Sequence, residues 1–244
     1  MTVQIVEVID RSIQGITRPF ICRGDDGNIY FVKGLGATRQ SQVYEWVAGN
    51  LGLYLGLPIA PFEIVDIPEE LLEFDNDLGL SELGSGPAFG SLKQHITELN
   101  YAGIYEVDEE VRRDVLAFDW WIRNSDRMMT EEGGNPNLFW DPKDSHLVVI
   151  DHNQAFDPDF NNDDFLEFHV FSLMRLDLFD DWERQRRYTT RFANALENWQ
   201  TICDSIPREW YYADKEMTVP ADINLEEILA MLELCQSDEF WSQQ

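Results

Sequence analysis

Three oxygen-bearing side chains and one lysine are the residues of this sequence whose types and order best suit chemistry. Asp126, Asn137 and Asp151 follow one another along the chain, and Lys33 lies far upstream of them. Carboxylate and amide oxygens are hard donors of the kind that Mg²⁺ prefers. Phosphoryl transfer needs a cation on the phosphates, metal ligands and a carboxylate that orients the acceptor hydroxyl. The sequence therefore offers every group that phosphoryl transfer requires.

Short motifs around these residues resemble the active-site core of the HipA-like kinase family. The motifs are Asn124-Ser125-Asp126-Arg127, then Asn135-Pro136-Asn137-Leu138, then Val149-Ile150-Asp151-His152. Their order is also similar to the Asp-Arg, Asn, Asp order of phosphoinositide kinases. Further segments that look like the family are 15–19, 30–33, the helix bearing Glu45, and 86–91. The resemblance covers about residues 12–175.

The resemblance implies a role for each of these residues in a bacterial ATP- and Mg²⁺-dependent kinase. Asp126 would be the catalytic carboxylate, and Asn137 and Asp151 would hold Mg²⁺ on the phosphates. Lys33 would contact the phosphates directly, and Glu45 on the following helix would orient it. The expected acceptor is a serine or threonine hydroxyl of a protein. A small-molecule acceptor, or transfer of AMP in place of phosphate, is the alternative within the same enzyme class.

Two further segments are implied to bind the nucleotide. The turn at 15–19, which contains Gly15 and Thr17, would lie over it, and Phe89 would line the adenine pocket.

The sequence departs from the protein-kinase pattern in two places. Asp126 and Asn137 stand eleven positions apart, further than in protein kinases, and we expect the extra length at 128–134 to form a surface hairpin. Asn135 is the alternative metal ligand, although Asn137 precedes an apolar residue as the kinase motif usually does. Asp151 is followed by His-Asn and not Phe-Gly, so an activation switch of the protein-kinase type is not expected. The insertion also leaves open a catalytically inactive, kinase-like module that binds nucleotide or a partner.

The predicted helices and strands that position these residues fall into two groups, before and after about residue 90. Strands are predicted at 3–9, 20–23, 29–33 and 60–67, and a helix at 41–55. The Asp26-Gly27 step predicts a hairpin turn between the second and third strands. Residues 73–92, with four glycines and Pro87, predict a loop.

The rest of the chain predicts a mostly helical lobe. Asp108 is a candidate cap for a helix that carries Val111, Val115, Phe118 and Ile122 on one face. A polar loop at 124–137, a strand at 146–150, a helix at 181–205 and a last helix opened by Asn224 and Glu227 follow. We therefore predict a two-lobed α+β, protein-kinase-like fold. A β-rich nucleotide-binding lobe would span 1–92, a helical catalytic lobe 93–244, and the ligand would lie between them.

The net charge of −28, from 18 basic and 46 acidic residues, restricts the partners. A surface this acidic repels nucleic-acid phosphates and anionic lipid heads. We therefore expect no direct binding to nucleic acid or to a membrane. A basic protein partner fits, and an acidic inhibitor or nucleic-acid mimic is the second alternative. The basic run at 183–187, with Arg191, predicts a helix face that pairs with nearby acids, or else binds an acidic substrate.

The remaining signals concern location and metal chemistry. The N-terminus lacks the pattern of a signal peptide, and no apolar run reaches the about 18 residues of a membrane span, so we expect a cytoplasmic protein. Cys22, Cys203 and Cys235 are expected to be free thiols. The histidines show no spacing typical of a zinc site.

Overall fold

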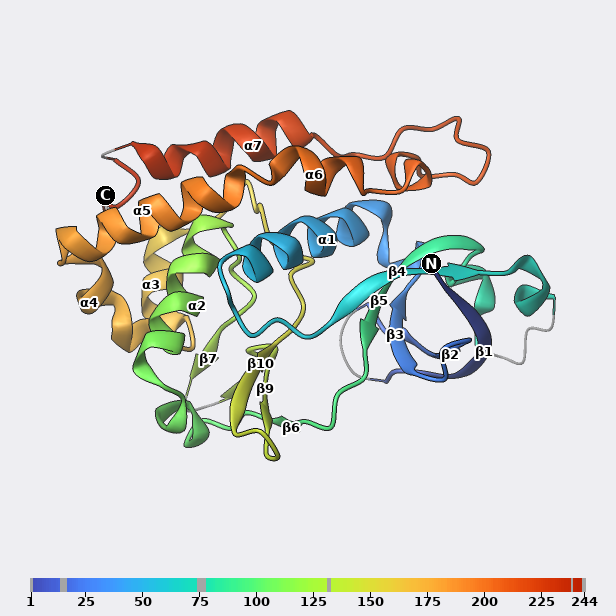
Figure 1. Ribbon diagram of the computed structural model, residues 1–244, viewed down its shortest axis with the longest axis horizontal. Coiled ribbons are helices and arrows are strands. Elements are labelled where there is room, and N and C mark those ends of the chain that lie inside the picture. Colours follow the sequence, from blue (N-terminus) through green and yellow to red (C-terminus); the bar gives the residue numbers. More distant parts are fainter. Residues whose placement is uncertain (1, 14–16, 74–77, 131–132, 238, 243–244) are drawn as a thin grey trace. The chain divides into compact units, whose positions relative to one another are not determined.

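The computed structural model of this protein (Figure 1) describes residues 2–13, 17–73, 78–130, 133–237 and 239–242. The chain forms two compact units. The first unit is Met1–Trp46, Ala60–His95 and Ser205–Ile223, and the second is Val47–Ile59, Ile96–Asp204 and Asn224–Gln244. The predicted division into 1–92 and 93–244 is simpler, because 47–59 and 205–223 each group with the other half of the chain.

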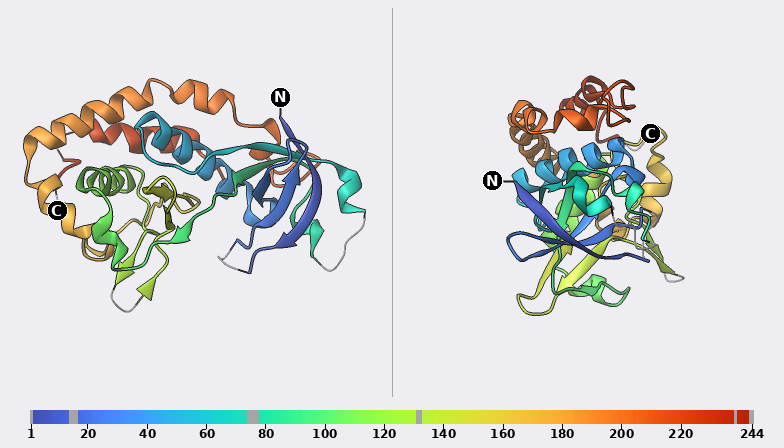
Figure 2. Two further views of the ribbon diagram at one scale, coloured as in Figure 1. Left: turned by 60° about the horizontal axis from the view of Figure 1, so that its bottom comes forward. Right: turned by 90° about the vertical axis from the view of Figure 1, so that its right-hand side faces the viewer.

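The first unit is a closed five-stranded barrel, seen as curved strands in Figure 1 and in the left-hand view of Figure 2. Its strands are β1 (Val3–Arg11), β2 (Phe20–Gly24), β3 (Ile29–Lys33), β4 (Phe62–Ile67) and β5 (Gly86–Leu92), in the order β1-β2-β3-β5-β4. β1 and β4 pair in parallel, and the other neighbours are antiparallel. Closing the barrel leaves no open sheet edge and buries an apolar core that includes Ile5, Phe20, Cys22, Tyr30, Val32 and Val65. Burial raises the pKa of the Cys22 thiol to about 12.

One loop of the barrel is the predicted hairpin, and the loop before it closes with a backbone hydrogen bond. Gly27, with a φ of +83°, completes the turn between β2 and β3, where the Asp26 carboxylate accepts from the Asn28 backbone N–H at 3.0 Å. The loop between β1 and β2 closes with a hydrogen bond from the Ser12 N–H to the Pro19 carbonyl at 2.8 Å.

The strand β5 corrects one prediction. The sequence predicts a loop over 73–92, yet β5 is paired on both edges, with β3 and with β4. Gly90 fits this strand because a Cβ there would lie only 2.7 Å from Cγ1 of Val65. Pro87 pairs with β4 and lies beyond the part of β5 that pairs with β3, so its missing N–H costs no hydrogen bond to β3. Tertiary pairing therefore overrides the local glycine and proline signals.

Helical turns complete the first unit. The 3₁₀ turns are η1 (Leu35–Ala37), η2 (Glu69–Leu72), η3 (Leu80–Glu82) and η6 (Arg208–Tyr211). The helix α1 (Arg39–Tyr54) begins in the first unit and ends among residues of the second. Gln42 of α1 donates from Nε2 to the Gly34 carbonyl at 2.8 Å, which fixes the helix just after β3.

The second unit is mostly helical, as predicted. Its helices are α2 (Glu109–Trp121), α3 (Asn162–Phe168), α4 (Arg175–Phe179), α5 (Trp182–Leu196), α6 (Trp199–Asp204) and α7 (Leu225–Glu233), with 3₁₀ turns η4 (Gly103–Glu106), η5 (Ser172–Met174) and η7 (Leu234–Gln236). Asp108 and Asn224 cap α2 and α7 as expected. The predicted helix over 181–205 is two helices, α5 and α6.

The second unit also contains two small sheets and an aromatic core. β6 (Thr97–Glu98), β9 (Leu138–Asp141) and β10 (His146–Val149) form one sheet, and β7 (Met129–Thr130) pairs with β8 (Gly133–Gly134). Trp121 is fully buried and stacks on Phe192 of α5 with ring centroids 4.3 Å apart. Among the described residues, no helix is both long and apolar enough to cross a bilayer.

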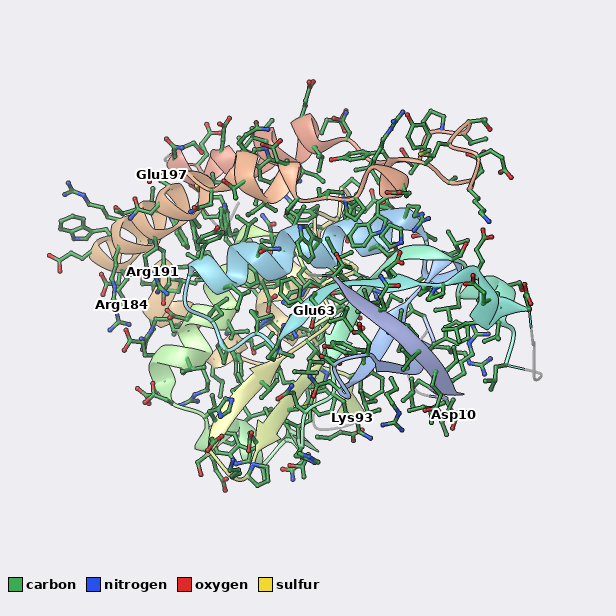
Figure 3. The ribbon with its side chains drawn as sticks, turned by 45° about the vertical axis from the view of Figure 1, so that its right-hand side comes forward. Asp10, Glu63, Lys93, Arg184, Arg191 and Glu197 are labelled. Atoms are coloured by element: carbon green, nitrogen blue, oxygen red, sulfur yellow. The ribbon has the colours of Figure 1, made fainter. Side chains whose placement is uncertain are left out.

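Arg184, Arg187 and Arg191 of α5 pair with acids of their own unit. Arg184 and Arg191 lie along this helix in Figure 3. Arg184 forms ion pairs with Asp177 and Asp181, and Arg191 binds Asp114 at 2.7 Å. The predicted pairing of this face with nearby acids is therefore confirmed.

Candidate active site

A hydrogen bond joins the proposed catalytic carboxylate to the first proposed metal ligand. Asp126 lies in the loop that follows α2, and Asn137 directly precedes β9. Nδ2 of Asn137 donates to Oδ2 of Asp126 at 2.9 Å. This bond uses the amide nitrogen of Asn137, so the carbonyl oxygen of the same side chain is the atom that suits a cation.

Asp151 reaches the same part of the second unit through the backbone. It follows β10, and the N–H of the preceding Ile150 donates to the Asn137 carbonyl at 3.2 Å. Asn137 and Asp151 have φ values of +53° and +59°, a left-handed conformation that is uncommon outside glycine, although Asn and Asp adopt it more often than most other residues. Such backbone strain clusters at functional sites and persists only where surrounding contacts enforce it. The Asn137 amide oxygen and the Asp151 carboxylate are donors whose chemistry fits Mg²⁺.

The extra length between Asp126 and Asn137 does not separate them. β7 and β8 pair antiparallel, so the insertion closes on itself as the predicted hairpin, although residues 131–132 lie outside the described part of the chain. Asn135, the alternative ligand, is exposed, whereas Asn137 is 6% exposed and bonded to Asp126. These contacts favour Asn137 over Asn135.

In the first unit, Lys33 forms a buried ion pair with Glu45. The Lys33 ammonium at the end of β3 donates to Oε1 of Glu45 on α1. Lys33 is 7% exposed and Glu45 2%. The chain has four lysines and the other three are exposed. Because lysine is almost never buried without a partner or a role, this burial sets Lys33 apart. The predicted pairing of these two side chains is present.

The remaining nucleotide-binding predictions fall on β5 and on the β1–β2 loop. Phe89 pairs with Lys33 across β3 and β5, so both side chains stand on one face of the sheet. Phe89 also stacks on Phe62 with centroids 5.4 Å apart and is 5% exposed. Thr17 is half-buried, and Gly15 lies outside the described residues.

The sequence profile of the HipA-like kinase family matches residues 5–244, nearly the whole chain. This protein belongs to the HipA-like kinase family. The predicted family is therefore confirmed, and the β-rich unit and mostly helical unit make up its α+β kinase-like fold.

Comparison with solved structures gives two similar kinases. The crystal structure of a Helicobacter pylori proinflammatory kinase, CtkA, aligns with a TM-score of 0.48 and 10% identity over 97% of this chain and 95% of that chain. The Golgi casein kinase with Mn/ADP bound aligns with a TM-score of 0.39 and 12% identity over 98% of this chain and 74% of that chain. No protein of curated function matches the sequence.

Asp119, a residue that the sequence analysis missed, lies at the centre of a buried network in this HipA-like kinase. Its Oδ2 accepts from Arg127 Nε at 2.7 Å and bonds to His169 Nε2 at 3.0 Å. Its Oδ1 accepts from Asn124 Nδ2 at 2.9 Å. Asp119 is fully buried, yet the Arg127 charge and these hydrogen bonds lower its pKa to about 2 despite the desolvation. The signal in the sequence is a single carboxylate within the apolar run from 115 to 122.

The protonation state of His169 follows from its two partners. The Phe171 backbone N–H donates to Nδ1 at 3.1 Å, so Nε2 carries the proton that points to Asp119. Burial lowers the pKa of His169 below its ordinary 6.5. The HipA-like kinase therefore holds a neutral histidine against a charged aspartate.

We predict that His169→Gln reduces the loss of stability on acidification. Below pH 6.5 the unfolded chain binds a proton at His169 that the folded chain resists, so the free energy of unfolding falls as the pH falls. The loss is at most about 1.4 kcal/mol per pH unit for one proton. Glutamine can still donate to Asp119 but does not titrate. Urea unfolding at about pH 7.5 and about pH 5.5 measures the difference. Equal losses in both proteins would contradict the assignment.

Proposed function

We propose that this protein is an ATP- and Mg²⁺-dependent kinase that phosphorylates a serine or threonine hydroxyl of a protein. The observation that carries the proposal is the hydrogen bond between Asn137 and Asp126. It joins a carboxylate suited to hold an acceptor hydroxyl to an amide suited to hold a metal. Family membership supports the transfer of a phosphoryl group.

In this proposal Asp126 binds and orients the acceptor hydroxyl and takes its proton during transfer. One oxygen of its carboxylate, Oδ2, accepts from Asn137, and its backbone N–H donates to Asn124 Oδ1 at 3.3 Å. One contact to the carboxylate and one to the backbone therefore hold Asp126 in place before the acceptor arrives, which lowers the entropic cost of reaction.

Asn137 and Asp151 would hold Mg²⁺, which would neutralise charge on the phosphates of ATP. Lys33 would contact these phosphates, and Glu45 would hold the lysine in one orientation. A buried pair of this kind adds little net stability, because both charges lose their hydration. The position that the pair gives to the ammonium group is therefore the better explanation of its presence. In a chain with a net charge of −28, a fixed local cation also offsets the general repulsion of ATP.

Nucleotide binding gives the first test. We predict that ATP with Mg²⁺ raises the thermal midpoint of the protein, and that Asp151→Asn removes most of the Mg²⁺-dependent part of this shift. Ligand at about 100 times its dissociation constant stabilises by about 2.7 kcal/mol. Differential scanning fluorimetry with ATP, GTP and AMP, each with and without Mg²⁺, measures the shifts. No shift with any nucleotide would contradict the proposal, and binding without product would favour the inactive nucleotide-binding module.

A further inference from the structure

We propose that Asp119 is a positioning residue that acts through Arg127 on Asn137 and Asp151, and through Asn124 on Asp126, in the candidate active site of the second unit. The inference rests on the proposed function, since it assigns the support of that same site. It begins from one contact, the buried ion pair between Asp119 Oδ2 and Arg127 Nε at 2.7 Å.

Arg127 fixes the backbone at both proposed metal ligands. Its Nη1 donates to the carbonyls of Pro136 at 3.0 Å, Asn137 at 3.1 Å and Ile150 at 3.2 Å. These carbonyls belong to the residue before Asn137, to Asn137 itself, and to the residue before Asp151. One guanidinium group thus joins two segments that are separate in the sequence.

The second oxygen of Asp119 is linked through Asn124 to the backbone of Asp126. Asn124 donates from Nδ2 to Asp119 Oδ1 at 2.9 Å, and its Oδ1 accepts from the Asp126 backbone N–H at 3.3 Å. Arg127, the residue after Asp126, is held by the other oxygen. Asp119 therefore fixes the loop on both sides of Asp126.

The backbone conformation of Asn137 and Asp151 and the burial of Arg127 explain why this support is needed. Asn137 and Asp151 both hold left-handed conformations that cost on the order of 1–3 kcal/mol each and that surrounding contacts must enforce. Arg127 is 1% exposed and Asp119 is completely buried. Without the Asp119 charge, the buried guanidinium would be paired only with neutral carbonyls and would move toward solvent. The strained segments would then lose their common support.

The test compares two identical substitutions on α2 of the full chain. Asp119→Asn removes the charge that holds Arg127. Asp114→Asn, the control, removes the charge that binds Arg191 at 2.7 Å on another side of the unit. We expect Asp119→Asn to lower kcat by about 10–100-fold, which is the usual effect of mutating a residue that supports a metal ligand. The KM for the acceptor should change little. Asp114→Asn should keep the kcat of the unchanged protein, even where urea unfolding shows a comparable loss of stability.

Hydrogen exchange gives a readout that does not depend on activity. Amides at 136–138 and 149–151 should exchange faster in Asp119→Asn than in Asp114→Asn. Arg127→Lys is the second variant, for the case that Asp119→Asn does not fold. Lysine keeps the charge beside Asp119 but lacks the planar fork that reaches three carbonyls, so kcat and exchange should change in the same direction.

The outcomes separate this inference from the proposed function. A folded Asp119→Asn protein with unchanged kcat and exchange would overturn it, as would an equal loss of kcat in Asp114→Asn. Absence of kinase activity in the unchanged protein would reject the proposed function, and the exchange measurement would still decide whether Asp119 supports these segments.

Discussion

Replacing Asp126 with asparagine is expected to lower kcat by about 10³-fold, the middle of the range for loss of a general base. Asparagine has nearly the same shape, and its carbonyl oxygen can still accept from Nδ2 of Asn137. The fold and the binding of ATP should therefore survive, because only the negative charge that holds and deprotonates the acceptor is lost. Steady-state phosphorylation and calorimetric ATP binding measure the two effects separately.

Asp144→Asn is the matched control for this substitution. Asp144 is an exposed carboxylate in the turn between β9 and β10 of the same unit, and its replacement should leave kcat unchanged. If Asp126→Asn kept the activity of Asp144→Asn, the role assigned to Asp126 would have to be abandoned.

Replacing Lys33 with methionine should lower kcat/KM by about 10²–10³-fold, the loss typical of one fixed group that stabilises transition-state charge. The substitution also leaves Glu45 buried without its cation, which costs about 3–5 kcal/mol where a buried pair is broken. Urea unfolding measures this cost, and kinetics with varied ATP measure the loss of activity.

A double substitution separates the two consequences. Lys33→Met with Glu45→Gln removes both charges, so most of the lost stability should return while kcat/KM stays low. Lys93→Met is the control, because Lys93 is an exposed lysine that follows β5 in the same unit (Figure 3). Full activity in Lys33→Met, equal to that of Lys93→Met, would show that the buried ammonium does not act on the phosphates.

The sequence singled out the residues of the candidate site but not the residues that support them. Asp126 and Asn137 were expected to act together, and the hydrogen bond between them joins them across an eleven-residue separation. Asp119 was missed because nothing in the sequence says that a carboxylate within an apolar helix meets an arginine eight positions later in the following loop. That pairing depends on how the loop turns back after α2.

Among the elements of the fold, those with local sequence signals were predicted and one that depends on tertiary pairing was not. Strands β1 to β4 were predictable because apolar alternation and an Asp-Gly turn are local signals. β5 was not, because its glycines and proline indicate a loop until the partners on both edges are known. The sequence singled out Lys33 and Glu45, but the burial of this pair depends on how α1 packs against β3, which no local pattern states.

The most direct test of the account follows the radioactive phosphate of ATP in the unchanged protein. The protein is incubated with Mg²⁺ and protein acceptors, in parallel with ATP labelled on the γ-phosphate and ATP labelled on the α-phosphate. We predict that label enters serine or threonine from the γ-labelled nucleotide only, and that Asp126→Asn shows none. Transfer from the α-labelled nucleotide would mean that AMP is transferred instead. No transfer from either, although ATP binds, would contradict the claim that this HipA-like kinase phosphorylates a protein hydroxyl.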